Sequence, residues 1–171
     1  LAPFRAANAE VLAVIDRWTT SVSLSKLPVE RSGLDQMYID LTAAVDLAVS
    51  RQVRMPECQG KVLGCPVSAV PDRLVIAADL AASLRQDIFT TTSLTASAGV
   101  SFTKALANIA ANANKPDGQA ILPACGARAH IADLSLGVLL GCGRRMCKLL
   151  RLGGIEKVGE LADATRERVA G

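Results

Sequence analysis

The stretch from Cys125 to Gly154 constrains the fold most, because it combines features that elsewhere in the chain stay apart. It holds three of the five cysteines and the only histidine, His130. It also holds the densest apolar run, from Ile131 to Leu140. A helix over residues 127–140 would be apolar on nearly every side, which is typical of a helix buried on most sides. We therefore predict that this helix is the central one of an all-α fold.

The composition also favours helices. Half of the residues are hydrophobic but only 3% are aromatic, so the apolar content is mainly Ala, Leu, Val and Ile. Alanine and leucine lose little side-chain entropy in a helix, which makes helices the expected elements. A chain of 171 residues has the size of one domain. We therefore predict a single all-α domain over residues 1–171, a bundle of about five to seven helices.

Apolar side chains at helical spacing place the individual helices. The pattern predicts helices over residues 4–24, 33–54, 73–92, 100–113, 127–140, 144–152 and 155–169. Trp18, the only tryptophan, lies centrally on the apolar stripe of the first helix, which is typical of a core residue. Prolines and glycines make residues 55–71 a long loop, in which Lys61-Val62-Leu63 can form a short extended piece.

Five cysteines and a first residue other than Met favour a secreted protein, in which cysteines commonly form disulfides. We therefore predict a disulfide-stapled bundle. The candidate disulfide residues are Cys58, Cys65, Cys125, Cys142 and Cys147. Because five is an odd number, one thiol stays free or links two copies of the chain in a homo-oligomer.

The pairing of the cysteines depends on the helix over residues 127–140. If this helix is continuous, Cys125 and Cys142 lie roughly 20 Å apart, whereas bonded cysteines have Cα atoms within about 7 Å. Cys125 is therefore expected to bond to the long loop or to stay free. Two networks remain open. One has a Cys58–Cys65 bond and a second bond among the last three cysteines, and the other joins both loop cysteines to the Cys125–Gly154 stretch.

The same residues do not form a metal-binding or catalytic pattern. Zinc sites usually contain two cysteine pairs with about two to four intervening residues each, whereas the two pairs here have six and four. His130 also lies on an otherwise apolar helix. No oxyanion-hole or nucleophile motif is present. Gly141-Cys142-Gly143 does not follow a predicted strand, as a dinucleotide-binding loop would. We therefore expect no metal, no cofactor, no catalytic residue and no enzymatic activity.

The net charge of +3 comes from one segment. Between Ala127 and Leu152 five basic residues accompany one acid, and Arg144, Arg145, Lys148 and Arg151 form a tight cluster. We interpret this cluster as the solvated face of an amphipathic helix or as a site for an anionic headgroup. The shortage of aromatic residues argues against base stacking, so we expect no nucleic acid. No apolar run reaches the ~20 residues that a membrane-spanning helix needs.

Together these patterns favour a secreted binding protein. A bundle rich in Ala, Leu and Val can enclose an apolar cavity between its helices, in which a hydrophobic ligand such as a lipid or fatty acid would lie. The candidate ligand-binding residues are Arg144, Arg145, Lys148, Trp18, Leu136 and Leu139. The alternative is a non-catalytic structural or protein-interaction module that self-associates or recognises a partner through its helix faces.

Overall fold

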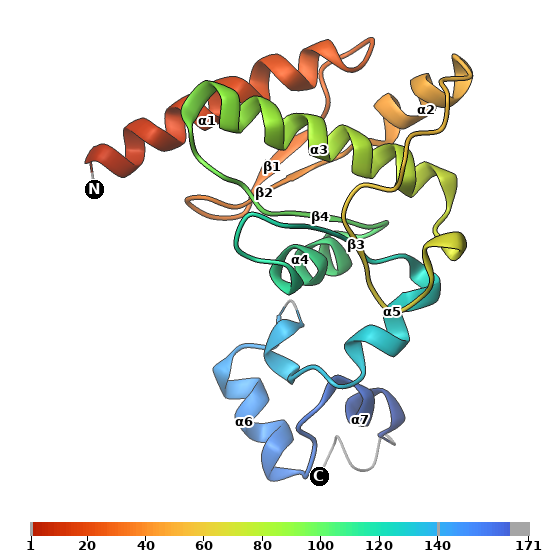
Figure 1. Cartoon of the computed structure of the whole chain (residues 1–171). Coiled ribbons are helices and arrows are strands. Elements are labelled where there is room, and N and C mark those ends of the chain that lie inside the picture. Colours follow the sequence, from red (N-terminus) through yellow and green to blue (C-terminus); the bar gives the residue numbers. More distant parts are fainter. Residues whose placement is uncertain (1, 140, 165–171) are drawn as a thin grey trace.

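The computed structural model describes residues 2–139 and 141–164 and has a mixed α/β fold (Figure 1). The helices in these ranges are α1 (Ala2–Ser21), α2 (Thr42–Ser50), α3 (Asp72–Thr92), α4 (Lys104–Ala113), α5 (Ala124–Ile131), α6 (Arg144–Leu152) and α7 (Val158–Asp163). The strands are β1 (Val29–Arg31), β2 (Met37–Ile39), β3 (Lys61–Val62), β4 (Ala98–Val100) and β5 (Gln119–Ile121). Two short 3-10 helices are η1 (Val67–Ala69) and η2 (Leu136–Val138).

The centre of the fold is a three-stranded parallel sheet in the order β3-β5-β4. Strand β5 is buried along its whole length, and successive side chains point to opposite faces of the sheet. Ile121 packs with Leu74 of α3, whereas Ala120 and Leu122 pack with Ile109 of α4. The sheet therefore lies between α3 on one face and α4 on the other (Figure 1).

An antiparallel pair of strands accompanies this sheet. Strands β1 and β2 form a hairpin in which Val29 pairs with Ile39. The apolar side chains Val29, Met37 and Ile39 pack against a core that α1 and α3 share. That core contains Trp18, whose side chain is 4% exposed and whose Nε1 donates a hydrogen bond to Ser83 Oγ at 3.2 Å. Trp18 is thus a core residue, as its position on the apolar stripe predicts.

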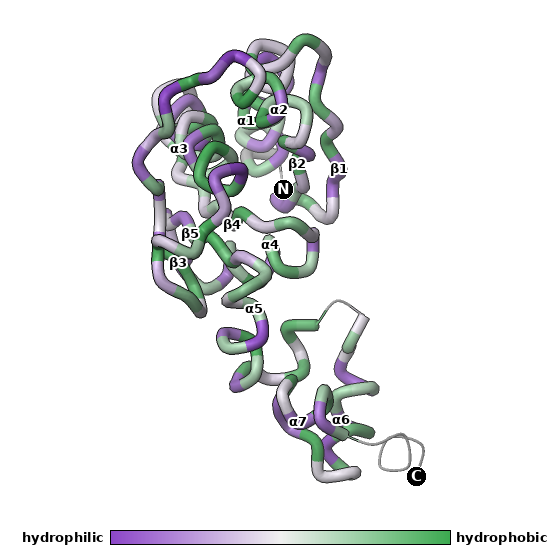
Figure 2. Tube along the Cα trace, turned by 90° about the vertical axis from the view of Figure 1, so that its right-hand side faces the viewer, coloured by the Kyte–Doolittle hydropathy of each residue, from purple (hydrophilic) through white to green (hydrophobic). Residues whose placement is uncertain are grey.

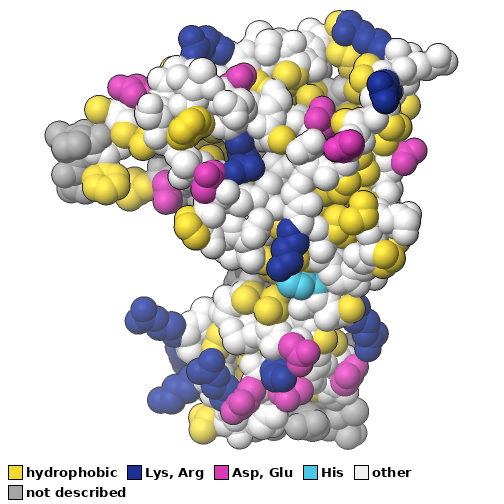
Figure 3. Space-filling view, in the orientation of Figure 1, with side chains coloured by type: hydrophobic (Ala, Val, Ile, Leu, Met, Phe, Trp, Pro, Cys, Tyr) yellow, Lys and Arg dark blue, Asp and Glu magenta, His cyan; other side chains and the backbone are white. Residues whose placement is uncertain are grey.

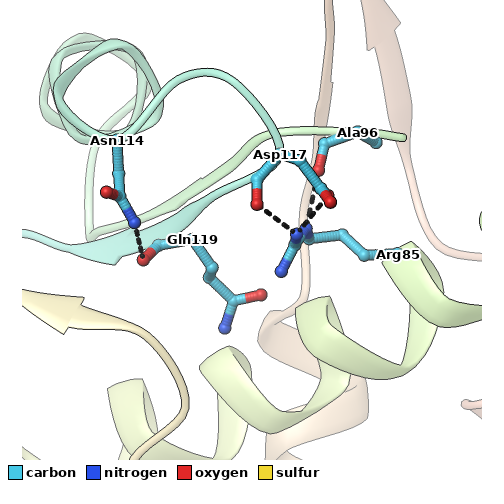
Figure 4. A network of polar contacts seen from close by, with 5 residues as sticks. All are labelled: Arg85, Ala96, Asn114, Asp117 and Gln119. Carbon is cyan, nitrogen blue, oxygen red and sulfur yellow. Dashed lines mark hydrogen bonds and ion pairs between the residues drawn. The ribbon is translucent and has the colours of Figure 1, made fainter.

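Arg85 of α3 fixes the two loops that lead into β4 and β5 (Figure 4). Its Nε donates a hydrogen bond to Ala96 O at 2.6 Å, and its Nη2 donates to Asp117 O at 3.1 Å and to Asp117 Oδ1 at 2.8 Å. Close to these contacts, Asn114 Nδ2 donates to the main-chain oxygen of Gln119 at 3.1 Å. A planar guanidinium can make several directed contacts at once. One side chain therefore holds α3 and both loops together.

The segment after α5 forms a smaller body that projects from the rest of the molecule (Figures 1 and 2). We call residues 2–123 the α/β part, and residues 132–139 and 141–164 the C-terminal part. Helix α5 joins them, and its Ala127 and Ile131 pack against the core under α4. Figure 2 shows α5 leading from the α/β part to the body that contains α6 and α7.

The prediction of an all-α bundle is wrong, because short strands build the centre of the fold. The apolar residues around the hairpin also fit a helical stripe, which predicted one helix over residues 33–54. In the structure Ser32 N donates to Gln36 O at 2.9 Å and closes the hairpin, so the helix begins at Thr42. Strands of two or three residues are too short to show the alternation that identifies a strand. The single-domain organisation of residues 1–171 stays a prediction.

Three helices lie close to their predicted ranges. The predictions over residues 4–24, 73–92 and 144–152 are confirmed by α1, α3 and α6. The predicted central helix over residues 127–140 is wrong, because α5 ends at Ile131 and is largely exposed. Of the helix predicted over residues 155–169, α7 accounts for six residues, and positions 165–169 lie outside the described ranges.

The predicted disulfide staple is also wrong, because all five cysteines are free thiols. Two pairs of sulfur atoms approach to 3.4 Å, Cys65 with Cys125 and Cys142 with Cys147. A disulfide bond is about 2.05 Å long, so neither pair is bonded. Cys125 nevertheless contacts the long loop over residues 55–71, which is the segment that it was expected to face.

Candidate functional site

Helix α6 presents four cations to solvent. Arg144, Lys148 and Arg151 follow one another at intervals of four and three residues, which places them on one side of the helix. Arg145 lies next to them, and all four residues are exposed. Directly beside these cations, Cys147 is buried and Leu150 is half-buried in the small core of the C-terminal part. The helix therefore packs through these two residues while its positive charge stays accessible.

None of these four cations forms an ion pair with a described residue, although Arg151 lines an open hollow together with Asp133 and Glu156. Residues 134–155 contain no acid. By contrast, Arg128 pairs with Asp163 at 3.1 Å and Lys157 with Asp133 at 2.9 Å. The hydrogen bond from Lys157 lowers the pKa of Asp133, and the same contact raises the pKa of Lys157. The cations of α6 can therefore bind an anion without first breaking an ion pair.

A glycine corner leads into α6. Gly141 has a φ of +88°, in the left-handed region that favours glycine. Cys142 N then donates to Leu139 O at 3.0 Å, and Cys147 N donates to Gly143 O at 3.0 Å. The contact between the two thiols raises the pKa of Cys142. This corner fixes the first turn of the basic helix.

Main-chain hydrogen bonds join α7 to residues 132–134, which precede η2. These segments form the rest of the C-terminal part, against which α6 packs. Val158 N donates to Leu134 O at 3.0 Å, and Gly159 N donates to Ala132 O at 2.9 Å. The side chain of Leu136 is fully buried in the same body. The basic helix therefore rests on a packed base and not on a free loop.

Figure 3 shows where this charge lies on the molecule. Lys and Arg side chains gather over α6 on one flank of the C-terminal part. On the same flank the molecule narrows between its two parts, so its outline is hollowed there. The cations therefore border a concave, open surface that a large polyanion can approach.

The described residues offer no site for a metal ion, because no three His, Cys, Asp or Glu side chains among them come together. Several carboxylates have other partners. Glu30 forms an ion pair with Lys104, and Asp40 accepts a hydrogen bond from Thr42 N at 2.9 Å. Hydrogen bonds from Thr42 lower the pKa of Asp40. These two carboxylates therefore already have hydrogen-bonding partners within the fold.

The structure brings together most of the residues proposed from the sequence as a ligand site. Arg144, Arg145 and Lys148 lie exposed on α6, Leu136 lies in the small core, and Leu139 is half-buried at the corner. Trp18 lies apart from them, in the core shared by α1 and α3. Arg151 was missing from that set, although its helical spacing from Arg144 and Lys148 identifies it as part of the same face.

The expected apolar cavity for a lipid is not present among the described residues. One open hollow of about 210 Å³ is lined by Val14, Arg17, Trp18, Ser21, Asp87 and Thr91. Another of about 450 Å³ is lined by Asp133, Ser135, Arg151, Glu156 and Lys157. Polar and charged side chains dominate both linings. Among the described helices, none is both long enough and apolar enough to cross a membrane.

Comparisons with known proteins identify relatives of this chain. The model of the impB/mucB/samB family matches residues 1–112. DNA polymerase IV of Neisseria meningitidis serogroup B is 30% identical over 158 residues, which are 92% of this chain and 39% of that protein. DNA polymerase IV of Streptomyces coelicolor is 41% identical over 86 residues, which are 50% of this chain and 18% of that protein. The chain therefore spans less than half the length of these relatives.

A solved structure shares the fold. The crystal structure of DinB from Sulfolobus solfataricus matches with a TM-score of 0.69 at 17% identity, over 98% of this chain and 40% of that one. This similarity agrees with the parallel sheet and contradicts an all-α bundle.

These relatives correct the functional interpretation of the sequence. The secreted lipid-binding bundle and the alternative structural or interaction module are both contradicted, because the relatives are named as DNA polymerase IV. The same names contradict the expectations of no enzymatic activity and no nucleic acid, together with the small hydrophobic ligand and the cysteine-linked homo-oligomer. Nucleic acid was excluded by counting aromatic side chains for base stacking, whereas contacts to phosphate groups need cations instead.

Both sequence comparisons extend over most of the chain. The family model covers residues 1–112, which is more than half of the 171 residues. The Neisseria alignment covers 92% of the chain, so it also includes most of the segment beyond residue 112. This chain therefore belongs to the impB/mucB/samB family.

Proposed function

We propose that this chain is part of a DNA polymerase of the kind named DNA polymerase IV, and that α6 binds the phosphate backbone of its DNA. The family and the names of the relatives support the first half of the proposal. The second half rests on one observation, the four exposed cations of α6 that have no ion-pair partner among the described residues. On this proposal the chain acts inside the cell, where DNA is found.

Uncompensated cations are suited to a polyanion. When Lys and Arg neutralise phosphates they release condensed counterions, so the logarithm of the binding constant falls with the logarithm of salt concentration by about 0.9 per phosphate contact. Arg144, Lys148 and Arg151 lie on one side of α6 and can face one backbone together. Arg guanidinium groups also bind phosphate oxygens in a bidentate manner.

The C-terminal part is better suited to duplex DNA than to single strands. The sequence contains no Phe, Tyr or Trp after Phe102, so α6 offers no ring on which an unpaired base could stack. Duplex DNA also presents a denser charge, with one phosphate per about 1.7 Å of helix axis. We therefore expect affinity that depends on charge density and little on base sequence.

The described residues do not fit the metal pair that polymerases use. Such sites hold two divalent ions with acidic side chains. No three His, Cys, Asp or Glu side chains come together in residues 2–139 and 141–164. No step of nucleotide addition is therefore assigned to these residues, and the role we propose for them is to bind and position DNA.

The proposal is tested by a salt titration of DNA binding. The variant Arg144→Ala/Lys148→Ala/Arg151→Ala removes the cations on one side of α6. Fluorescence anisotropy with a labelled duplex should give a lower affinity and a salt dependence weaker by about 2 to 3 in logarithmic slope. The wild-type protein should bind a single strand of the same sequence more weakly than the duplex.

A matched control removes the same number of positive charges elsewhere. Lys26, Arg73 and Lys104 each form an ion pair with a carboxylate. The variant Lys26→Ala/Arg73→Ala/Lys104→Ala should keep most of the wild-type slope, although its net charge changes equally. Equal losses in the two variants would mean that net charge, and not α6, governs binding, and the proposal for α6 would then be wrong.

A further inference from the structure

Two cysteines from distant parts of the sequence lie side by side at the N-terminal end of α5. The sulfur atoms of Cys65 and Cys125 lie 3.4 Å apart, and Cys125 is exposed to solvent. Cys65 lies in the loop after β3, and Cys125 lies in the first turn of α5. Cys58, the other cysteine of the long loop, instead packs against the core beneath α3.

Two glycines hold these cysteines in place. Gly64 has a φ of +76°, and a Cβ built on it would lie 2.0 Å from Gly126 O. A Cβ built on Gly126 would in turn lie 2.3 Å from Leu63 O and 3.1 Å from Cys65 N. Because neither position has room for a side chain, the two backbones touch directly. The residues that flank this crossing, Cys65 and Cys125, are therefore held beside each other by the main chain.

We propose that Cys65 and Cys125 form a modification site for low-molecular-weight disulfides, which close the two free thiols into a reversible bond. A disulfide bond needs the sulfur atoms to approach to about 2.05 Å. Starting from 3.4 Å, small rotations of the two side chains supply this change. The inference rests on the backbone crossing and the thiol contact, and it does not depend on the proposed binding of DNA.

The reaction proceeds by thiol–disulfide exchange. The thiolate of Cys125 attacks one sulfur of a disulfide RSSR, the S–S bond of RSSR breaks, and one RSH leaves with the proton lost by Cys125. The thiolate of Cys65 then attacks the Cys125 sulfur, and a second RSH leaves with the proton of Cys65. The two protein thiols lose two electrons and RSSR gains them. Partial burial raises the pKa of the Cys65 thiol, so the exposed Cys125 is the thiol that reacts first.

The bond would tie α5 to the α/β part. It would close a loop of about 60 residues in the unfolded chain, which lowers the entropy of the unfolded state. Stabilisation of this kind should raise Tm by roughly 10 °C, and a reductant should reverse the shift.

The test is peptide mapping of the native protein after incubation with oxidised glutathione. Free thiols are blocked by alkylation, and the protein is then digested with trypsin without reduction. Cys65 lies in peptide 62–73 and Cys125 in peptide 105–128, because the bond between Lys115 and Pro116 resists cleavage. We expect these two peptides to be linked, and we expect the higher Tm to disappear on addition of dithiothreitol.

Three variants make the test specific. Cys125→Ser should lose both the linked peptide and the Tm shift, whereas Cys58→Ser should keep both. The variant Cys142→Ser/Cys147→Ser removes the other close pair of thiols and should also keep both. Glutathione that remains on peptide 105–128, a link from Cys125 to Cys58, or two unmodified thiols would each overturn the proposal.

Discussion

At the scale of single residues, the amide of Gln119 joins three segments inside the fold. Its side chain is 4% exposed, and its Nε2 donates hydrogen bonds to Gln59 O at 2.9 Å and to Ala78 O at 2.7 Å. An amide nitrogen has two hydrogens to donate, and here each meets a carbonyl from a different segment. Its Oε1 has no partner among the described residues, and a buried group without a partner carries a desolvation cost. A side chain at position 119 therefore needs hydrogen-bond donors for the two carbonyl groups, whereas the acceptor oxygen Oε1 stays without a partner.

A carboxyl group at this position should be stable only when it is protonated. In Gln119→Glu a charged carboxylate would lie against two carbonyl oxygens, so burial should raise its folded-state pKa above the unfolded value of about 4.3. The free energy of unfolding should then be well below that of the wild type at pH 7. As the pH falls toward 5, the deficit should shrink by up to about 1.4 kcal/mol per pH unit, because the folded state holds the proton that the unfolded state has lost.

Urea unfolding at pH 7 and pH 5 measures this deficit, with Gln119→Met as the matched control. The methionine variant loses both hydrogen bonds and should be less stable by roughly 2–3 kcal/mol at both pH values. If the deficit of Gln119→Glu were independent of pH between 7 and 5, the carboxyl group would not be buried against the two carbonyls.

At the scale of elements, the side chain of Arg85 connects α3 to the two loops that precede β4 and β5 (Figure 4). The variant Arg85→Lys keeps the charge, but one ammonium cannot donate to Ala96 O, Asp117 O and Asp117 Oδ1 in the same geometry. We expect a loss of about 1–2 kcal/mol in the free energy of unfolding. Hydrogen exchange should become faster in the loops that precede β4 and β5.

Arg73→Lys is the control for this change, because Arg73 also lies on α3 and pairs with Asp46 while both side chains stay largely exposed. An exposed pair contributes about 0–1 kcal/mol, so this variant should unfold close to the wild type. Equal stability losses in the two variants would show that the Arg85 contacts do not hold the loops.

The elements also show what the sequence could predict. Helices α1, α3 and α6 repeat their apolar residues over two or more turns, so their periodicity identified them. The strands have two or three residues and could not show an alternating pattern. The close packing of α4 on β4 depends on Gly99, where a Cβ would lie 2.0 Å from Ala107 O, and a single glycine does not predict such a contact. The four cations of the basic cluster do lie together on α6, but charge alone does not identify what they would bind.

At the scale of the whole molecule, the C-terminal part has a core of its own. Leu136, Cys147 and Ile155 form a small buried cluster, which is separate from the clusters on either face of the sheet. Helix α5 connects the two bodies (Figure 2). A small separate core predicts that this part can open locally while the sheet stays folded, because local stability follows the number of buried apolar contacts.

A substitution that leaves a cavity in the small core should therefore destabilise the C-terminal part and leave the α/β part largely unaffected. Leu136 is fully buried, and Leu136→Ala should lower the free energy of unfolding of the C-terminal part by about 2–5 kcal/mol. Hydrogen exchange measured by mass spectrometry should become faster in α6 and α7, with little change in α3 and β5. The same variant should bind duplex DNA more weakly, because α6 would lose its packed base.

The matched variant is Ile121→Ala, which removes an equally buried side chain from β5. It should accelerate exchange in α3, β4 and β5, because Ile121 belongs to the core beneath α3. If Leu136→Ala instead accelerated exchange equally in α3 and α6, both bodies would unfold as one cooperative unit. The prediction of one domain over residues 1–171 would then hold in the energetic sense, although the chain has two bodies in space. If hydrogen exchange became faster in α6 and α7 alone, the C-terminal part would be a unit that can unfold while the sheet stays folded. The basic helix α6 would then belong to that unit, which α5 connects to the sheet.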